Sequence, residues 1–364
     1  MMSVDELNEN LELENNDPQV PQVNPIEEAT PAEPPVLEPG HERWQQSRLD
    51  LSKVANVVNK VKNEVGKVIV GQDEYIELLL TALFTGGHVL VEGVPGIAKT
   101  LMAKLMAKTL DTQFSRIQFT PDLMPSDVIG TTVFNMKTSE FTFKQGPIFA
   151  NVILVDEINR APAKTQAAMF EVMEEHQVTA DGVTYAFEFP FFVVATQNPI
   201  EQEGTYKLPE AQLDRFIFKI HVDYPDLADE KAILKRFSRD FDMKSVADVS
   251  AVFTTKDVRE CRELIEQVHI KDQLLDYIAG IVHETRNNPD LFLGASPRAS
   301  LAIMKTSKAV AAMNGRDFVT PDDIQYVAYP VLNHRVILTP EREMEGIDTR
   351  SLIRDIMKSV EVPR

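Results

Sequence analysis

The segment HVLVEGVPGIAKTLMAKLMAKTL, residues 88 to 110, constrains the fold of this 364-residue chain more than any other. It opens with a short apolar run typical of a β-strand and closes with a stretch typical of a helix. Between them, GVPGIAKT follows the phosphate-binding pattern G-x-x-x-x-G-K-[ST], except that Ala98 stands in place of the second glycine. A strand, a glycine-rich loop and a helix in this order predict an α/β domain with a nucleotide site.

The consequence of Ala98 depends on its backbone conformation. A positive φ would cost alanine about 1 kcal/mol or more, whereas a right-handed conformation, as the first step into the helix, would cost little. We expect the right-handed conformation. Backbone N–H groups and the helix N-terminus would then hold phosphate, Lys99 would reach the outer phosphates, and the Thr100 hydroxyl would help to bind magnesium. The alternative is a Gly-Pro turn that only leads into a helix.

Polar residues close two further apolar runs. Asp156 and Glu157 end VILVDE, and Asn198 follows FFVVAT. Ligands of open α/β sheets bind at the carboxyl ends of the strands, so these side chains suit a metal–phosphate site. Asp156 would hold the magnesium through water, and Glu157 would polarise the attacking water. Alone, the acidic pair could be an exposed loop, and Asn198–Pro199 could be a turn.

Two arginines occupy less informative places. Arg215 lies in LPEAQLDRF, directly before the last predicted strand, and Arg298 lies in GASPRAS, near the start of a helix. Isolated arginines are usually solvated surface residues, so neither position alone indicates a function.

Apolar runs and their periods divide the chain into three parts. Strands alternate with helices between residues 44 and 224, with hairpins predicted in residues 120–150 and around Asp181-Gly182, where a type I′ turn is expected. From residue 225 to 364 four or five helices follow without a clear strand, and Thr320 is a well-marked helix N-cap. This order predicts a parallel-sheet α/β domain and then an all-α domain.

The first part, residues 1–43, is expected to be a disordered tail. Its first 40 residues hold ten Asp or Glu, seven Pro and no Lys or Arg. It could be a solubilising tail or a docking arm for a basic partner. The whole chain has a net charge of −19, which disfavours binding to nucleic acid.

Several classes of protein are disfavoured by composition. The single cysteine, Cys261, allows no intrachain disulfide, and the seven histidines do not fall at zinc-ligand spacing. No run approaches the ~20 apolar residues of a membrane helix, and the N-terminus has no signal-peptide pattern. We therefore expect a cytoplasmic protein that is not inserted in a membrane.

Taken together, these segments resemble the MoxR family of the AAA+ ATPase superfamily. The order VIVGQ, GVPGIAKT, FTPDLMPSDVIG, FKQGPIFANVILVDEINRA, ATQNP, LPEAQLDRF, GASPRA is similar to that family from Trp44 to Arg364. The phosphate loop is shared by many ATPases, but the longer strings are specific to this family. Members commonly have alanine before the loop lysine, which supports Ala98 as a native feature of a working loop.

The resemblance implies a fold and a role for each matching residue. The fold is an AAA+ P-loop domain with a five-stranded parallel sheet and hairpin inserts, followed by an α-helical lid. Lys99 and Thr100 match Walker A, Asp156 and Glu157 match Walker B with Glu157 as the catalytic base, and Asn198 matches sensor 1. Thr100 and Asp156 would bind Mg²⁺. The implied ATP-binding positions are Val70 and Gly71 at the adenine pocket and Gly93, Val94, Pro95, Gly96, Ile97, Ala98, Lys99, Thr100 and Leu101 in the loop.

The two arginines also gain roles from the resemblance. Arg215 matches the arginine finger, which acts on the ATP of the neighbouring subunit, and Arg298 matches sensor 2, which reaches the γ-phosphate of its own subunit. Residues 120–150 resemble the helix-2 insert and residues 178–190 the hairpin before sensor 1. In related rings both project toward the central pore.

The implied function is ATP hydrolysis in a homo-oligomeric ring, expected to be a hexamer, with chaperone-like remodelling or maturation of partner complexes. The partners of such proteins often contain von Willebrand A-type domains. One alternative is a nucleotide-gated binding scaffold with negligible turnover, which the intact Glu157 disfavours. Another is a nucleic-acid motor, which the acidic charge disfavours. The residues do not identify the client, the ring stoichiometry or the role of the tail.

Overall fold

A computed structural model describes residues 49–94, 96–137, 139–198, 206–239 and 246–363. The predicted tail, residues 1–43, and the predicted ATP-binding residue Pro95 lie outside this range. Residues 48–364 form one compact unit. The predicted boundary at residues 224–225 falls between the last strand of the sheet and the next helix, and it stays a prediction.

A five-stranded parallel sheet forms the centre of this unit, as predicted. Its order is β2-β5-β8-β1-β9, so the strand before the glycine-rich loop lies next to the last strand. The strands are β1 (His88–Gly93), β2 (Phe114–Gln118), β5 (Val152–Asp156), β8 (Phe192–Gln197) and β9 (Phe216–Val222). All four pairings are parallel, so one edge of the sheet collects the carboxyl ends of the strands and the other the amino ends.

Each face of the sheet packs against its own hydrophobic cluster. Because side chains alternate along a strand, Val89 and Val91 belong to one cluster and Leu90 belongs to the other. This two-sided burial explains the continuous apolar runs in the sequence.

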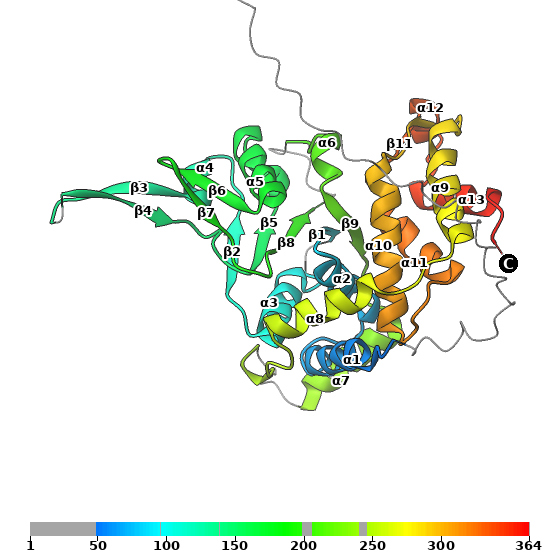
Figure 1. Ribbon diagram of the computed structural model, residues 1–364, viewed down its shortest axis with the longest axis horizontal. Helices are drawn as coiled ribbons and strands as arrows, with labels where there is room; N and C mark the ends of the chain where they lie inside the picture. Colours follow the sequence, from blue (N-terminus) through cyan, green and yellow to red (C-terminus); the bar gives the residue numbers. More distant parts are fainter. Residues whose placement is uncertain (1–48, 95, 138, 199–205, 240–245, 364) are drawn as a thin grey trace, which may run out of the picture. The chain divides into compact units, whose positions relative to one another are not determined.

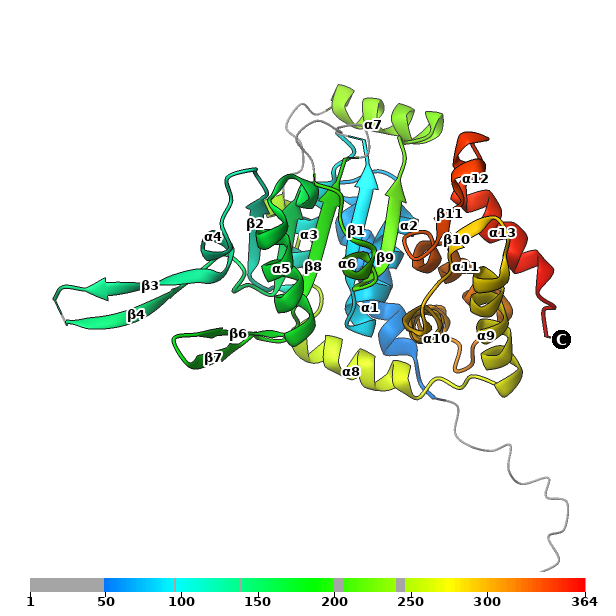
Figure 2. The same ribbon diagram turned by 90° about the horizontal axis from the view of Figure 1, so that it is seen from above.

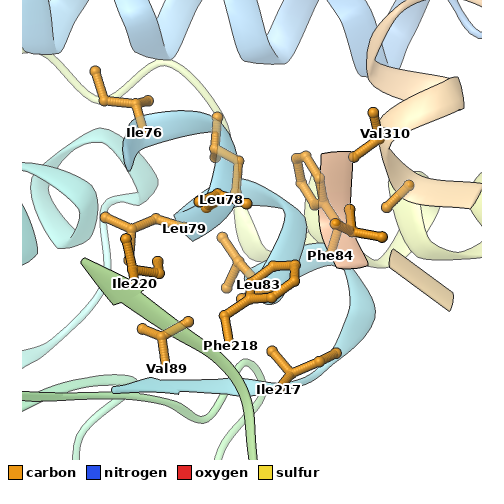
Figure 3. Packing of buried hydrophobic residues seen from close by; sticks show 14 of the residues in the cluster. Ile76, Leu78, Leu79, Leu83, Phe84, Val89, Ile217, Phe218, Ile220 and Val310 are labelled. Carbon is orange, nitrogen blue, oxygen red and sulfur yellow. The ribbon is translucent and has the colours of Figure 1, made fainter. Parts of the chain in front are cut away.

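Helices cover both faces. On the first face lie α1 (Ser52–Gly66), α2 (Asp73–Thr85) and α3 (Lys99–Leu110). Figure 3 shows Leu79 and Leu83 of α2 against Phe218 of β9, and all three side chains are buried. On the second face α5 (Ala163–Glu175) contributes Met169, Phe170 and Met173 to the other cluster. The apolar residues whose spacing predicted these helices are therefore the residues that are buried in the two clusters.

Two hairpins extend from the core on the side opposite to the helices of residues 272–359 (Figures 1 and 2). The first is β3 (Gly130–Asn135) with β4 (Glu140–Gln145), and the short helix α4 (Pro125–Ile129), which the sequence did not indicate, leads into it. The second is β6 (Gln177–Ala180) with β7 (Val183–Ala186). Its turn has positive φ at both Asp181 and Gly182, as a type I′ turn requires. The rings of Phe143 and Tyr185 stack between the hairpins with centroids 4.8 Å apart.

Helices dominate the chain after β9. They are α7 (Leu227–Arg239), α8 (Thr255–Glu266), α9 (Asp272–Asn287), α10 (Pro297–Met313), α11 (Pro321–Leu332), α12 (Pro340–Met344) and α13 (Thr349–Ser359). Thr320 forms a capping box with Asp323 at the start of α11, as its sequence predicted. One expectation needs correction, because β10 (Leu291–Leu293) and β11 (Ile337–Leu338) form a small antiparallel pair here. Two and three residues are too short to give a periodic signal.

The remaining short elements are α6 (Glu210–Leu213) and the 3₁₀ turns η1 (Ile158–Arg160) and η2 (Val246–Asp248). None of the helices built from the described residues is long and apolar enough to cross a membrane.

Candidate active site

The glycine-rich loop joins β1 to α3 at the carboxyl edge of the sheet. Gly96 has a φ of 90° and Ala98 a φ of 63° with ψ of 22°, so both residues are left-handed. The expected right-handed conformation of Ala98 is therefore wrong. Ala98 is the N-cap of α3, and its carbonyl accepts a hydrogen bond from the Met102 N–H at 2.8 Å. The loop turns into the helix through this residue, at a cost of about 1–2 kcal/mol in backbone strain.

Two side chains hold the loop. The ammonium group of Lys99 donates to the carbonyl of Gly93 at 2.5 Å. The amide of Gln72, from the segment before α2, donates to the carbonyl of Ile97 at 3.3 Å. The lysine therefore already lies along the loop whose N–H groups and helix N-terminus can receive phosphate.

Asp156 is the centre of the polar cluster beside the loop. Its carboxylate accepts from the Thr196 hydroxyl at 3.0 Å and from the Thr100 hydroxyl at 3.4 Å. It also accepts from Arg116 Nε at 2.6 Å, although only 9% of the Asp156 side chain is exposed. A carboxylate and a hydroxyl this close are hard oxygen ligands of the kind that Mg²⁺ prefers. The predicted metal ligands, Thr100 and Asp156, thus fit the ion chemically. In this structure the positive charge opposite the Asp156 carboxylate is the guanidinium of Arg116.

Glu157 lies immediately after β5, with a φ of 56°. Its N–H donates to the Thr196 hydroxyl at 3.0 Å. Its carboxylate accepts from Gln118 at 2.7 Å and pairs with Arg160 at 3.1 Å. The side chain is therefore held at the carboxyl edge of the sheet, next to Asp156.

Asn198 follows β8 directly and lies at the same edge. The register pairs Val155 with Ala195 and Glu92 with Gln197, so the end of β8 lies between the ends of β5 and β1. The structure thus brings the residues matching Walker A, Walker B and sensor 1 to one edge, as the strand ends predicted.

Three residues of this cluster were missed by sequence reasoning: Arg116, Gln118 and Thr196. Arg116 and Gln118 alternate with apolar residues at the end of β2, which indicates one polar face pointing toward the site. Thr196 lies within an apolar strand, where a threonine carries no signal of its own.

A pocket of about 240 Å³ lies beside the loop, at the carboxyl end of β9. Its lining includes Gln72 and Tyr75 from the start of α2 and Asp229 from α7. The predicted adenine-pocket residue Gly71 lies close to Asp229, because a Cβ added at Gly71 would overlap that carboxylate. Val70 and Gly71 directly precede Gln72, the first residue of the pocket lining. The two predicted residues therefore border the pocket without lining it.

Tyr75 brings an unusual polar group to this pocket. Its side chain is 4% exposed, and its hydroxyl has no hydrogen-bond partner among the described residues. Burial, and then the nearby charge of Asp156, raises the pKa of Tyr75, so the hydroxyl stays protonated. A buried hydroxyl without a partner is costly and suits a site that receives a ligand.

The two predicted arginines lie together, away from the loop. Arg215 Nη2 is 2.8 Å from Glu174 Oε2, and Arg298 Nη2 is 3.1 Å from Glu174 Oε1. Glu174 is in the last turn of α5, Arg215 precedes β9, and Arg298 is in the first turn of α10. Glu174 was not indicated by the sequence.

This arginine pair is at the amino edge of the sheet. His88, the first residue of β1, is beside Phe216 of β9 and hydrogen-bonds to the carbonyl of Met173 at 3.1 Å. The six residues of β1 separate this edge from the loop. Five steps of about 3.3 Å from the first residue to the last make this distance about 16 Å. The expectation that Arg298 reaches the γ-phosphate of its own subunit is therefore not met, because α10 docks at the wrong edge. The Arg215 side chain is 28% exposed at this edge, where it pairs with Glu174.

Comparisons with known proteins show the family to which the chain belongs. Residues 88–218 match the family of ATPases associated with various cellular activities (AAA), and residues 283–356 match the AAA lid domain. The chain is 46% identical to the uncharacterized protein YeaC of Bacillus subtilis over 84% of its length and 95% of the relative. It is 40% identical to Chaperone MoxR1 of Mycobacterium tuberculosis, covering 90% and 88%.

More distant relatives and a solved structure extend the match. Protein MoxR of Methylorubrum extorquens is 30% identical over 84% of this chain and 94% of that protein. A crystal structure of a candidate ATPase from Cytophaga hutchinsonii is 47% identical, with a TM-score of 0.78 over 86% of this chain and 98% of that one. With its parallel sheet, helical lid and loop geometry, the chain belongs to the MoxR family of AAA+ ATPases.

Proposed function

We propose that this protein binds and hydrolyses ATP in a head-to-tail homo-oligomeric ring and uses the cycle to remodel partner proteins. The observation that carries the proposal is the separation of two half-sites on one chain. Lys99, Asp156 and Glu157 are at the carboxyl edge of the sheet, and Arg215 is at the amino edge. The arginine at the amino edge of one subunit could complete the nucleotide site at the carboxyl edge only of another subunit. A ring with head-to-tail (heterologous) contacts brings these two edges together.

Within one half-site each group has a distinct task. The loop N–H groups and Lys99 would bind the phosphates, and the base would occupy the pocket lined by Gln72 and Tyr75. Magnesium, when held by Thr100 and Asp156, neutralises charge on the phosphates. Glu157 would accept a proton from the attacking water, and Gln118 and Arg160 hold its carboxylate in place. Asn198 would orient that water.

The arginines would complete the site of the adjacent subunit. Because Arg215 and Arg298 share Glu174, we propose that both act on the same neighbouring nucleotide. An arginine finger typically contributes a factor of about 10³ to 10⁵ in rate. Hydrolysis should then depend on assembly, and the expected hexamer is one closed ring that satisfies this geometry.

The two hairpins are the proposed contact with partner proteins. Phe134, Met136 and Phe141 are 47%, 88% and 74% exposed at the end of the first hairpin. Exposed apolar side chains at the tip of an insert suit a transient protein contact. A chaperone-like activity follows the naming of the relative MoxR1, and von Willebrand A-type proteins are the proposed class of partner.

A complementation experiment tests the proposal. Glu157→Gln removes the base but keeps the arginines, and Arg215→Ala removes the finger but keeps the base. Each variant alone should lose at least about 100-fold in steady-state ATP turnover while still binding ATP. Mixed in equal amounts, the two should recover about a quarter of the wild-type rate, because that share of the heterologous interfaces pairs an intact base with an intact arginine.

Two results would count against the proposal. A mixture no more active than its components would show that the site is not shared between subunits. Equal, near-zero rates for wild type and Glu157→Gln would show that the chain has no turnover of its own.

A further inference from the structure

We propose that Glu174 is a positioning residue, which holds Arg215 and Arg298 side by side so that both meet the nucleotide of the adjacent subunit. This inference rests on the proposed shared site. It assigns a task to a carboxylate that neither binds the loop nor belongs to any motif in the sequence.

The geometry is that of a bridge. Each carboxylate oxygen of Glu174 takes one guanidinium, at 2.8 Å for Arg215 and 3.1 Å for Arg298. The three residues come from three elements, namely the end of α5, the residue before β9 and the first turn of α10. The carboxylate therefore joins the core to the lid at the point where the two arginines meet.

The backbone on both sides of Arg215 is fixed by a different residue. The side chain of Arg335 is 3% exposed and pairs with Asp214 through Nε at 2.7 Å. Its Nη2 also donates to the carbonyls of Asp214 at 3.1 Å and Phe216 at 2.6 Å. These carbonyls flank Arg215, so the main chain at this residue cannot shift without breaking hydrogen bonds to the buried Arg335 side chain.

The backbone near Arg298 is tied to the same aspartate. The Ser296 hydroxyl donates to Asp214 Oδ2 at 3.0 Å, and Ser296 is the N-cap of α10. Both arginines thus start from fixed anchor points. What remains adjustable is the direction of their long side chains, and this is what Glu174 sets.

Charge explains why a carboxylate is needed there. Two guanidinium groups held close together repel each other, and an anion between them offsets that repulsion. The Glu174 side chain is 41% exposed and the Arg298 side chain 55% exposed, and ion pairs this exposed contribute at most about 1 kcal/mol to stability. A displacement of about 1 Å in a catalytic group, by contrast, can cost up to about 100-fold in rate. The effect of Glu174 should therefore be seen in turnover, not in stability.

The test compares three substitutions with wild type and with Arg215→Ala in ATP turnover. Glu174→Gln keeps the shape and removes the charge, and kcat should fall at least about tenfold with KM within about twofold. Glu174→Asp keeps the charge and should recover part of the loss. Glu175→Gln, at the exposed neighbouring position, should match wild type. The melting temperatures of all three should stay close to that of wild type.

Mixing Glu174→Gln with each of the other variants shows which half-site is impaired. Glu174→Gln should be rescued by Glu157→Gln, which carries intact arginines, and not by Arg215→Ala, which has the same half-site impaired. A merely structural weakening of the subunit would not follow this pattern.

The outcomes distinguish a failure of the positioning role from a failure of the shared site. If Arg215→Ala abolishes turnover and Glu174→Gln stays within twofold of wild type, the positioning role is overturned and the shared site stands. If Arg215→Ala leaves turnover unchanged, the shared site fails, and the role of Glu174 fails with it. Rescue of Glu174→Gln by Arg215→Ala would place its defect in the nucleotide half-site and would also overturn the inference.

Discussion

His88 offers a measurable link between the folding of this chain and pH. It opens β1, is 4% exposed, and is hydrogen-bonded on both ring nitrogens. Nε2 donates to the carbonyl of Met173 at 3.1 Å, and Nδ1 accepts from the Val193 N–H at 3.1 Å. These partners require the neutral ring with its proton on Nε2. A second proton on Nδ1 would face an N–H donor.

Burial, reinforced by the positive charges of His176 and Arg262, lowers the pKa of His88 from 6.5 to about 4, against the opposing effect of the Met173 carbonyl. In the unfolded chain the ring titrates near its ordinary value, so between these two pKa values the unfolded state binds the extra proton. Stability is therefore intact above the unfolded pKa and is lost as the pH falls toward the folded pKa. At 1.36 kcal/mol per unit, the loss is about 2 kcal/mol between about pH 7 and about pH 5, and about 3 kcal/mol at pH 4.

The assay is the free energy of unfolding from urea titrations followed by circular dichroism across this pH range. His88→Gln can still donate and accept but cannot titrate, so its stability should fall less steeply than that of wild type below pH 6.5. Some slope should remain, because burial also lowers the pKa of His334 well below its usual value. His283→Gln, at an exposed position on α9, controls for the loss of a histidine. Parallel curves for wild type and His88→Gln would refute the reasoning.

Two further substitutions test features of the fold. Ala98→Gly should remove the left-handed strain at the N-cap of α3 and stabilise the folded chain by up to about 1 kcal/mol, reduced by the greater freedom of glycine in the unfolded chain; a loss of stability in urea titrations would contradict the φ of 63°. Phe170→Ala should cost about 3–5 kcal/mol, because it empties a core position where the ring is 1% exposed and meets Phe216 edge-on at 5.7 Å. Phe134→Ala, on the exposed hairpin, is its control and should change stability by less than about 0.5 kcal/mol.

The gathering of the residues of the proposed nucleotide half-site at one edge could be predicted, because they lie at the ends of parallel strands. Lys99, Asp156 and Asn198 each follow an apolar run, and the topology brings those ends together whatever the loops do. The hairpin at Asp181 was predictable for a similarly local reason, since an Asp-Gly pair tolerates positive φ at both positions.

The conformation of Ala98 and the partner of Arg298 could not be predicted in the same way. The conformation of Ala98 depends on how the loop crosses from β1 to α3. The presence of an alanine at this position does not indicate that path. The partner of Arg298 depends on where the lid docks, and the apolar period of a helix shows which face is buried but not against what. Glu174 is one of several acidic residues near the end of α5, so only the docked lid distinguishes it.

The docking of the lid also decides which parts move together. Asn333, His334 and Arg335 directly follow α11, and their side chains reach the backbone carbonyls of β9 at Lys219 (2.8 Å), Phe216 (2.9 Å) and Ile217 (3.2 Å). Strand β9 is the edge of the sheet, and these bonds cover polar groups that an edge strand otherwise leaves open.

A lid bound in this way cannot swing over the nucleotide of its own subunit without exposing those carbonyls and the buried Arg335. The arginine pair and the lid therefore form one body with the amino edge of the sheet. In the proposed ring, loss of the γ-phosphate would release this body from the neighbouring subunit, so the movement that hydrolysis drives would occur between subunits. The hairpins, which extend from the opposite side of the core (Figure 2), would then be displaced with the whole subunit that carries them.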